Sequence, residues 1–292
     1  MSHEKKQILL GTAAVILLLI LLAMAAVVFG KWMHESGLPQ IPGLSGPGAQ
    51  TQEPEYPLIP MIPMPEKPVA RPNPYSDEDF ILEDGFMQLV GKETITGIDV
   101  SYYQKDIDWQ QVKDFGIQFV IIRLGCRGYE TGNLIVDKKV YEYLEGARSV
   151  GLKIGAYFYS QAINRAEAVE EALFCLDILD GLPLDMPVVY DWEYVSDKAR
   201  TANMTGQTLM GCTIAFCETI KAGGYQPMVY FNPHMEKVYL DLAVLQKKGY
   251  PFWLAHYTDT MTFPYRVQMW QYSYTGKVPG IEGGVDLNII LP

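Results

Sequence analysis

Two acidic residues, Asp191 and Glu193, are the side chains of this sequence best placed to do chemistry. They follow the apolar run Met186–Tyr190, and at a spacing of two they share one side of an extended strand. Two acids at the end of a buried strand cost free energy unless they are solvated, hydrogen-bonded or partly protonated. Glycoside hydrolysis uses such a pair, because one carboxylic acid protonates the leaving oxygen while a carboxylate handles the positive charge at the anomeric carbon. On a surface strand, the same Asp-X-Glu pattern would place two carboxylates in solvent and would not indicate catalysis.

Further acids at other strand ends strengthen this interpretation. Asp99 ends the first predicted strand and Asp286 begins the last. Aromatic rings pack on the apolar faces of sugars while amides and acids meet the hydroxyls. The candidate substrate-binding residues at strand ends are Tyr157, Tyr159, Trp192, Tyr230, Asn232, Trp253, His256, Tyr257 and Gln271. His256 is either a proton handler or a hydrogen-bonded support, and we expect at least one of the tryptophans, Trp270 included, to be structural.

Eight apolar runs after Thr94 predict the strands that position these residues: Ile95–Ser101, Phe119–Gly125, Lys153–Ser160, Met186–Glu193, Gln226–Asn232, Pro251–Tyr257, Arg266–Ser273 and Val285–Leu291. Four amphipathic stretches predict helices, several ending at glycine: Trp109–Phe115, Val136–Val150, Arg165–Leu179 and Thr205–Ala222. Strands with helical crossovers predict an α/β fold, a closed parallel-type barrel with its active site at the C-terminal strand ends. The last three strands leave little room for helices, and so we expect irregularity there.

A long apolar segment, Ile8–Phe29, precedes the barrel. Its 22 residues would span about 33 Å as a helix, enough for a hydrocarbon core of about 30 Å. Lys5 and Lys6 precede it, and the positive-inside rule then keeps the N-terminus in the cytoplasm. We therefore expect residues 1–30 to form a cytoplasmic N-terminus and single-pass signal anchor in the cell membrane, with the catalytic domain extracytoplasmic. A signal peptide cleaved near residues 23–25, giving a secreted protein, is the alternative.

A proline-rich stretch joins this segment to the barrel. Eleven of the 19 prolines lie between Pro39 and Pro74, and proline cannot continue a helix or a central strand. The sequence predicts an extracytoplasmic linker over residues 31–93 and a catalytic barrel over residues 94–292. Within this linker, the acidic stretch 77–91 either packs against the barrel or stays loose.

Charge and cysteine content exclude several classes of function. The net charge is −11 and no basic run is present, which argues against nucleic-acid binding. The four cysteines form neither a CxxC pair nor a zinc-ligand cluster, so we expect small apolar residues at Cys126, Cys175, Cys212 and Cys217. No metal or organic cofactor is implied.

Residues 95–292 resemble glycoside hydrolase family 25, the Chalaropsis-type lysozymes or N-acetylmuramidases. The stretches that carry the resemblance occur in the family's order: Gly-Ile-Asp-Val-Ser at 97–101, Phe-Val-Ile-Ile-Arg at 119–123, Gly-Ala-Tyr-Phe-Tyr at 155–159, Val-Val-Tyr-Asp-Trp-Glu at 188–193, Phe-Trp-Leu-Ala-His-Tyr at 252–257, Met-Trp-Gln-Tyr-Ser at 269–273 and Val-Asp-Leu-Asn at 285–288. One departure is Phe158, where many members carry histidine.

The resemblance implies an irregular (β/α) barrel of five β/α units plus three further strands. It implies hydrolysis, with retention of configuration, of the β-1,4 bond between N-acetylmuramic acid and N-acetylglucosamine in the glycan strand of bacterial peptidoglycan. The family's general acid matches Glu193, and its other active-site acids match Asp191, Asp99 and Asp286. Asp191 is either a nucleophile or the carboxylate that orients the substrate's own acetamido group.

Two other functions stay open beside this one. A chitinase-like family 18 barrel also places Asp-X-Glu after strand four, but it needs acids two and five residues before Asp191, where this chain has Val189 and Met186. A catalytically silent barrel that binds the cell wall or serves as a scaffold is the alternative from another class. The presence of all four acids argues against it.

Overall fold

The computed structural model describes residues 69–292 of the chain. The predicted signal anchor at residues 1–30, and the predicted linker up to residue 68, lie outside the described residues. Within residues 69–292, no helix is both long and apolar enough to cross a membrane.

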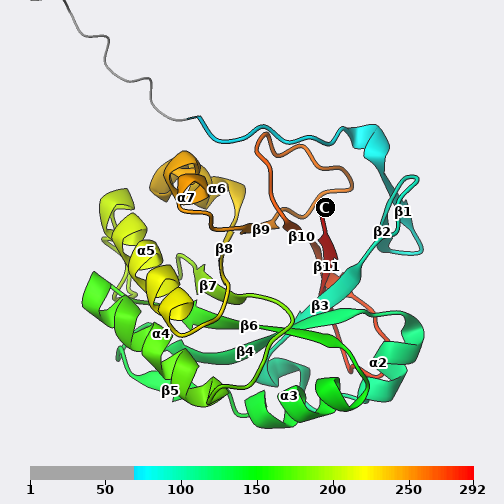
Figure 1. Cartoon of the computed structure of the whole chain (residues 1–292), viewed down its shortest axis with the longest axis horizontal. Coiled ribbons are helices and arrows are strands. Elements are labelled where there is room, and N and C mark those ends of the chain that lie inside the picture. Colours follow the sequence, from blue (N-terminus) through cyan, green and yellow to red (C-terminus); the bar gives the residue numbers. More distant parts are fainter. Residues whose placement is uncertain (1–68) are drawn as a thin grey trace, which may run out of the picture. The chain divides into compact units, whose positions relative to one another are not determined.

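Eight strands close into a mixed barrel (Figure 1). Seven of them run parallel, and the last pairs antiparallel with both of its neighbours, closing the ring. In chain order they are β3 (Thr96–Val100), β4 (Phe119–Arg127), β6 (Lys153–Ser160), β7 (Val188–Trp192), β8 (Pro227–Phe231), β9 (Phe252–Ala255), β10 (Met269–Gly276) and β11 (Val285–Ile290). The eight predicted strands are thus confirmed, with ends shifted by a few residues. The short β5 (Leu134–Val136) extends β4 as an antiparallel pair.

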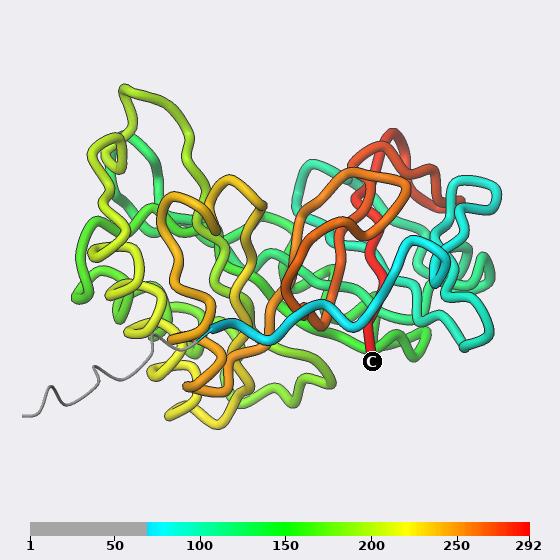
Figure 2. Tube along the Cα trace, turned by 90° about the horizontal axis from the view of Figure 1, so that it is seen from above, coloured from blue at the N-terminus to red at the C-terminus, as the bar shows by residue number. Residues whose placement is uncertain are grey.

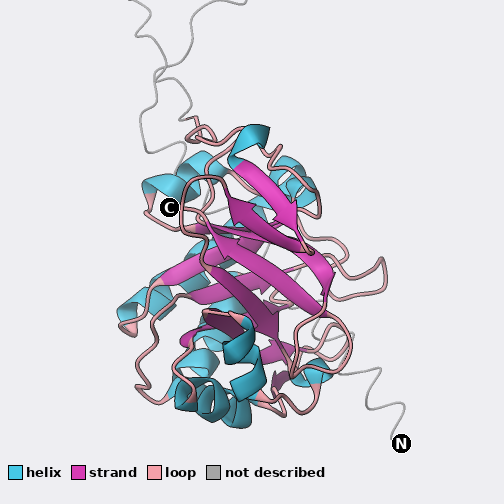
Figure 3. Cartoon of the chain, turned by 90° about the vertical axis from the view of Figure 1, so that its right-hand side faces the viewer, coloured by secondary structure: helices cyan, strands magenta, loops and turns pink. Residues whose placement is uncertain are grey.

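Helices follow the first five barrel strands and surround the sheet (Figure 3). They are α2 (Trp109–Phe115), α3 (Val140–Ser149), α4 (Arg165–Leu179), α5 (Gly206–Ala222), α6 (Pro233–Tyr239) and α7 (Leu242–Lys247). The four predicted helices are confirmed, and α6 and α7 are additional. Side chains of Asp108, Asn164 and Thr205 cap α2, α4 and α5 by accepting from backbone N–H groups of the first turn. In this described region β9, β10 and β11 follow one another without a helix, which confirms the expected irregularity.

The apolar core has two layers because side chains alternate along each strand. The barrel interior contains Phe119, Ile121, Val189 and Met228, whereas a larger layer fills the space between strands and helices. Gly97 leaves room in the interior, since a Cβ atom there would lie 2.4 Å from the Phe119 ring. On β7 this alternation points Val189 and Asp191 into the barrel. Tyr190 and Trp192 point toward the helices.

The segment before the barrel is packed, which answers the question left open by its sequence. A 3-10 turn, η1 (Asp77–Asp79), leads into an antiparallel hairpin of β1 (Phe80–Glu83) and β2 (Phe86–Leu89). Phe80 is buried with its ring 5.3 Å from that of Trp270. Residues 69–76 run along the outside of the barrel beside residues 263–266 (Figure 2). The predicted linker, residues 31–93, therefore overlaps a packed segment from residue 69 onward.

All four cysteines are free, and three of them, Cys175, Cys212 and Cys217, are buried among apolar side chains. Cys126 is partly exposed. The expectation that they act as small apolar residues rather than as a disulfide or metal framework agrees with this placement for the three buried ones.

Candidate active site

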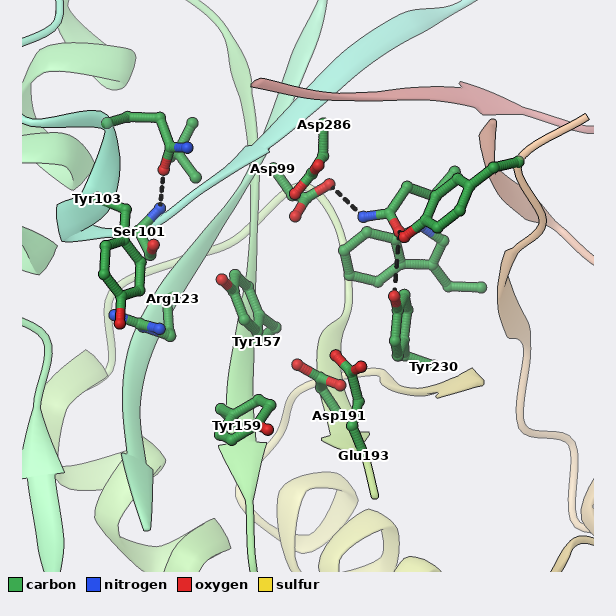
Figure 4. Close-up of a pocket in the computed structure, with 15 residues that line it drawn as sticks. Asp99, Ser101, Tyr103, Arg123, Tyr157, Tyr159, Asp191, Glu193, Tyr230 and Asp286 are labelled. Atoms are coloured by element: carbon green, nitrogen blue, oxygen red, sulfur yellow. Dashed lines mark hydrogen bonds between the residues drawn. The ribbon is translucent and has the colours of Figure 1, made fainter. Parts of the chain in front are cut away.

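One cavity of about 280 Å³ opens at the C-terminal ends of the parallel strands (Figure 4). All four predicted acids line it, as do several aromatic and amide residues. The lining consists of Asp99, Val100, Ser101, Tyr103, Gln104, Arg123, Tyr157, Tyr159, Asp191, Glu193, Tyr230, Trp253, Tyr257, Gln271 and Asp286. The predicted convergence of four acids from three distant parts of the sequence is confirmed.

The strand topology explains how the acids meet in two pairs. Asp99 lies near the end of β3 and is the direct register partner of Asp286 on the antiparallel β11, whose beginning therefore reaches the cavity. Asp191 is the fourth residue of β7, and Glu193 comes directly after that strand. Figure 4 shows Asp191 and Glu193 side by side, across the cavity from Asp99 and Asp286.

Two buried amides hold the Asp99 carboxylate. Gln271 Nε2 and Asn288 Nδ2 each donate to Asp99 Oδ2 at 2.8 Å. Asn288 Oδ1 in turn accepts from the indole N–H of Trp253 at 2.8 Å. Gln271 Oε1 accepts from the hydroxyl groups of Tyr230 at 3.0 Å and Tyr257 at 2.8 Å. Because each amide uses its oxygen for other donors, its NH₂ group must face Asp99, which makes Asp99 Oδ2 an acceptor.

A proton shared between Asp99 and Asp286 lies on Asp286. Burial raises the pKa of Asp99, while hydrogen bonds from Asn288, Gln271 and Asp286 oppose the rise. Burial and the neighbouring Asp99 charge raise the pKa of Asp286 to about 9. Asp286 is therefore a neutral hydrogen-bond donor to Asp99 at neutral pH.

The second pair also favours a bound proton. Burial raises the pKa of Asp191 well above its ordinary value, Glu193 and Asp99 raise it further, and Arg123 lowers it. Burial, followed by the charge of Asp99, raises the pKa of Glu193. Two adjacent acids of this kind titrate as a unit and hold one proton over a wide pH range. Asp191 Oδ1 is buried and has no hydrogen-bond partner among the described residues.

Arg123 brings a positive charge to the cavity that the sequence analysis did not assign to the site. Its Nε and Nη2 atoms contact Asp137 Oδ2 at 2.8 and 2.7 Å. The rings of Tyr102 and Tyr103 lie 5.1 and 5.4 Å from its guanidinium carbon. A signal was present, because Arg123 is the charged residue within the apolar run 119–125. Its charge favours the ionised form of Asp191.

Four tyrosines and one tryptophan of the predicted set line the cavity as expected. Burial raises the pKa of the hydroxyl group of each tyrosine, Tyr157, Tyr159, Tyr230 and Tyr257. These hydroxyls therefore stay protonated and can donate hydrogen bonds. Trp253 packs edge-on against Tyr230, with ring centroids 4.8 Å apart. Together with Gln271 they give the cavity the aromatic and amide character suited to a sugar.

Three predicted substrate-binding residues do not line the cavity. Trp192 points to the helix layer, where it packs against Tyr239, because neighbouring residues on a strand face opposite sides. Asn232 caps α6 by accepting from the backbone N–H groups of His234 and Met235. His256 lies outside the cavity lining; its Nδ1 atom is 3.5 Å from Thr258 Oγ1, and its backbone carbonyl accepts from Trp270 Nε1 at 2.7 Å. Trp270 is structural, as expected for at least one tryptophan.

Other lining residues were missed by the sequence analysis. Ser101, Tyr103 and Gln104 follow β3 in the short turn η2 (Tyr102–Gln104) and line the cavity beside Arg123. Their position directly after the Asp99 strand was the available signal. Phe158, the departure from the family pattern, is buried and packs edge-on against Phe174, outside the cavity. Among the described residues, no group of three or more His, Cys, Asp or Glu side chains is arranged to hold a metal ion.

Comparison with known proteins places the chain in a family of glycosyl hydrolases. The family model "Glycosyl hydrolases family 25" matches residues 98–281. The uncharacterised protein YegX of Escherichia coli K12 is 32% identical over 214 residues, which cover 70% of this chain and 72% of YegX. The autolytic lysozyme of Clostridium acetobutylicum is 28% identical over 193 residues, which cover 66% of this chain and 54% of that protein.

Solved structures agree with this grouping. The modular autolysin LytC of Streptococcus pneumoniae superposes with a TM-score of 0.61 at 26% identity, covering 73% of this chain and 52% of LytC. The present chain thus spans about half the length of that protein. A second structure of LytC is a complex with a synthetic peptidoglycan ligand.

Proposed function

Because the chain belongs to glycosyl hydrolase family 25 and is a glycoside hydrolase, we propose that it acts as an N-acetylmuramidase. The substrate would be the glycan strand of bacterial peptidoglycan, and the bond cut would be the β-1,4 bond between N-acetylmuramic acid and N-acetylglucosamine. The observation that carries the proposal is the meeting of two carboxyl pairs in one sugar-sized cavity. Relatives with lysozyme and autolysin names support peptidoglycan as the substrate class.

Glu193 serves as the general acid. It follows β7 at the mouth of the cavity, and both its burial and the charge of Asp99 favour its protonated form. A carboxylic acid kept protonated near neutral pH can transfer its proton to the leaving glycosidic oxygen. Glu193 would then accept a proton from water in the second step, as microscopic reversibility requires.

Asp191 serves as the carboxylate of the pair. This role requires the shared proton to sit on Glu193 and the charge on Asp191. Burial and the charge of Glu193 raise the pKa of Asp191 well above its ordinary value, and Arg123 is the neighbouring charge that lowers it. The Asp191 carboxylate, which lines the cavity, either attacks the anomeric carbon or accepts the N–H of the substrate's acetamido group. In both cases a negative charge meets the positive charge that develops on the sugar.

Asp99 and Asp286 support this pair from the opposite wall. Asp99 is an ionised acceptor held by two amides, and its charge raises the pKa of both Asp191 and Glu193. Asp286 is neutral and shares its proton with Asp99. The two residues thus help to keep the proton that the first step consumes.

We further propose that the enzyme works outside the cytoplasm and is held at the membrane by residues 1–30, with a spacer over residues 31–68 before the packed part of the chain. The apolar run Ile8–Phe29 and the prolines after it support this proposal. Fractionation of cells tests it. Full-length protein in the membrane fraction is the expected result, whereas a shortened soluble form alone would point to signal cleavage.

Digestion of purified peptidoglycan tests the activity. The wild-type protein should release fragments whose new reducing ends are N-acetylmuramic acid by mass spectrometry, and Glu193→Gln should lower the rate by about 10³-fold or more. Equal release by both proteins would contradict the role of Glu193. Binding of the wall without release by either protein would favour the silent scaffold instead.

A further inference from the structure

A buried amide outside the cavity, Gln161, bonds to the backbone of Glu193. Its Nε2 atom donates to the carbonyl oxygens of Glu193 at 3.0 Å and Ser160 at 2.9 Å. Its Oε1 atom accepts from the hydroxyl of Thr201 at 2.7 Å. Gln161 is 0% exposed, and so water cannot replace these bonds. One side chain therefore ties the end of β6 to two points of the segment that follows β7.

The strand ladder fixes Asp191 but not Glu193. Asp191 has register partners on both sides, Tyr159 on β6 and Tyr230 on β8. Pairing of β7 with β8 ends at Asp191, and pairing with β6 ends at Trp192. The carbonyl of Glu193 lies beyond both ladders, and its partner is the Gln161 side chain.

The backbone of Gln161 is itself held by ionic groups. Its N–H donates to Glu171 Oε1 at 3.3 Å, and its carbonyl accepts from Arg200 Nη1 at 2.8 Å. Glu171 is fully buried and also accepts from Arg127 Nε at 2.8 Å and Ser160 Oγ at 2.6 Å. Every polar group of Gln161 thus has a partner, which makes the amide a rigid support.

We propose that Gln161 is a positioning residue that sets the place of the Glu193 carboxyl group relative to the scissile oxygen. The inference rests on the proposed role of Glu193 as general acid. Gln161 does not line the cavity and acts only through the backbone of Glu193. A displacement of about 1 Å at a reacting group lowers the rate by about 10²-fold, so the loss of this anchor should be measurable.

The test uses Gln161→Met in the full-length protein and two substrates that differ in leaving group. Methionine keeps the length of the side chain and removes its donors and acceptor. On peptidoglycan we expect kcat to fall about 10- to 100-fold with KM changed by less than about threefold. On a nitrophenyl β-glycoside of the GlcNAc–MurNAc disaccharide we expect a loss below about threefold, because a nitrophenolate leaves without protonation.

Asn164→Ala supplies the matched control for lost stability. Asn164 caps α4 by accepting from the Glu167 backbone N–H at 3.0 Å. It lies in the turn shared with Gln161 but makes no hydrogen bond to Glu193 in the described part of the chain. This variant should lower Tm and leave the ratio of the two kcat values unchanged. Thr201→Val, which removes only the hydroxyl that orients the Gln161 amide, should give a smaller loss that is again confined to peptidoglycan.

Outcomes separate this inference from the proposed function. Equal losses of Gln161→Met on both substrates, or unchanged turnover of peptidoglycan, would overturn the positioning role. If Gln161→Met does not fold, Thr201→Val decides by the same comparison. An inactive wild type, or full activity of Glu193→Gln, would instead reject the proposed function itself.

Discussion

Asp99 and Asp286 are register partners on two adjacent antiparallel strands, and their carboxyl groups share a hydrogen bond. Two amide N–H groups donate to Asp99 Oδ2 and favour its ionised form, while burial and the charge of Asp99 raise the pKa of Asp286 to about 9, so we assign the shared proton to Asp286. The barrel closes at this strand pair, and its closure therefore places an uncharged acid beside an ionised one in the wall of the cavity.

Asp286→Asn should make the protein more stable at alkaline pH. An unfolded Asp286 is ionised above its ordinary pKa of 3.8, whereas the folded residue keeps its proton up to a pH of about 9. Between these values folding takes up a proton, so this residue lowers stability as pH rises. Asparagine stays neutral and can still donate to Asp99. Thermal unfolding should show Tm of the variant above wild type by about a few degrees at pH 8 and little difference at pH 4. A constant offset at all pH values would contradict the shared proton.

Gln271→Leu should lower catalysis through Asp99. Leucine keeps the approximate volume but removes one of the two donors to Asp99 and the acceptor for the Tyr230 and Tyr257 hydroxyls. We expect kcat on peptidoglycan to fall about 10- to 100-fold and the free energy of unfolding to fall by about 1–3 kcal/mol.

The control for Gln271→Leu is Gln118→Leu. Gln118 Oε1 accepts from the backbone N–H of Thr96 at 2.9 Å, at the end of β3 away from the cavity. This substitution should cost stability by a similar mechanism while kcat stays near wild type. If both variants lose the same activity, the effect of Gln271 is structural only.

The alkaline limb of the pH–activity profile should depend on Asp99. Activity requires the protonated form of Glu193, whose pKa is raised by burial and by the charge of Asp99. The rate therefore falls as pH rises through a value above the ordinary 4.5 of glutamic acid. In Asp99→Asn the raising charge is gone, and the limb should move to lower pH by on the order of one unit. The measurement is the residual activity of the variant on peptidoglycan across pH. If the alkaline limb does not move, burial alone raises the pKa of Glu193.

Local sequence rules were sufficient to predict the barrel strands and the convergence of the four acids in one cavity. Period-two alternation and the position of strand ends predicted that Asp191 and Glu193 share a face and that Asp99 and Asp286 join them. The same alternation places Trp192 on the opposite face from Asp191. Trp192 could therefore have been excluded from the predicted substrate-binding residues by its position in the sequence.

Other features of the site depend on contacts between distant parts of the chain. The bonds from Gln271 and Asn288 to Asp99 join residues 172 and 189 positions apart, and no local pattern specifies them. Asn232 was assigned to substrate because α6 was not predicted, although Asn before Pro233 is a typical helix start. The packing of the hairpin onto Trp270 likewise depends on tertiary contacts that could not be predicted from the acidic sequence of residues 77–91.

Phe80→Ala should reduce stability without reducing turnover, because the hairpin packs on the outside of the barrel. The Phe80 ring is buried and lies 5.3 Å from Trp270 and 5.5 Å from Tyr75. Its truncation leaves a cavity, and we expect the free energy of unfolding to fall by about 3–5 kcal/mol. Gln271, the next residue after Trp270, faces the active site, but strand pairing with β9 and β11 holds it there. Below the unfolding temperature kcat should therefore stay within about threefold of wild type.

Leu82→Ala on the same strand is the matched control for Phe80→Ala. Leu82 is 43% exposed, and so its truncation should change stability by no more than about 0.5 kcal/mol. Urea unfolding of the two variants gives the comparison. A large loss for Phe80→Ala alone means that residues 77–91 are part of the folded enzyme, and that its independent folding unit begins before the first barrel strand. Small and equal effects would mean that the barrel holds together without the hairpin, as a boundary at residue 94 requires.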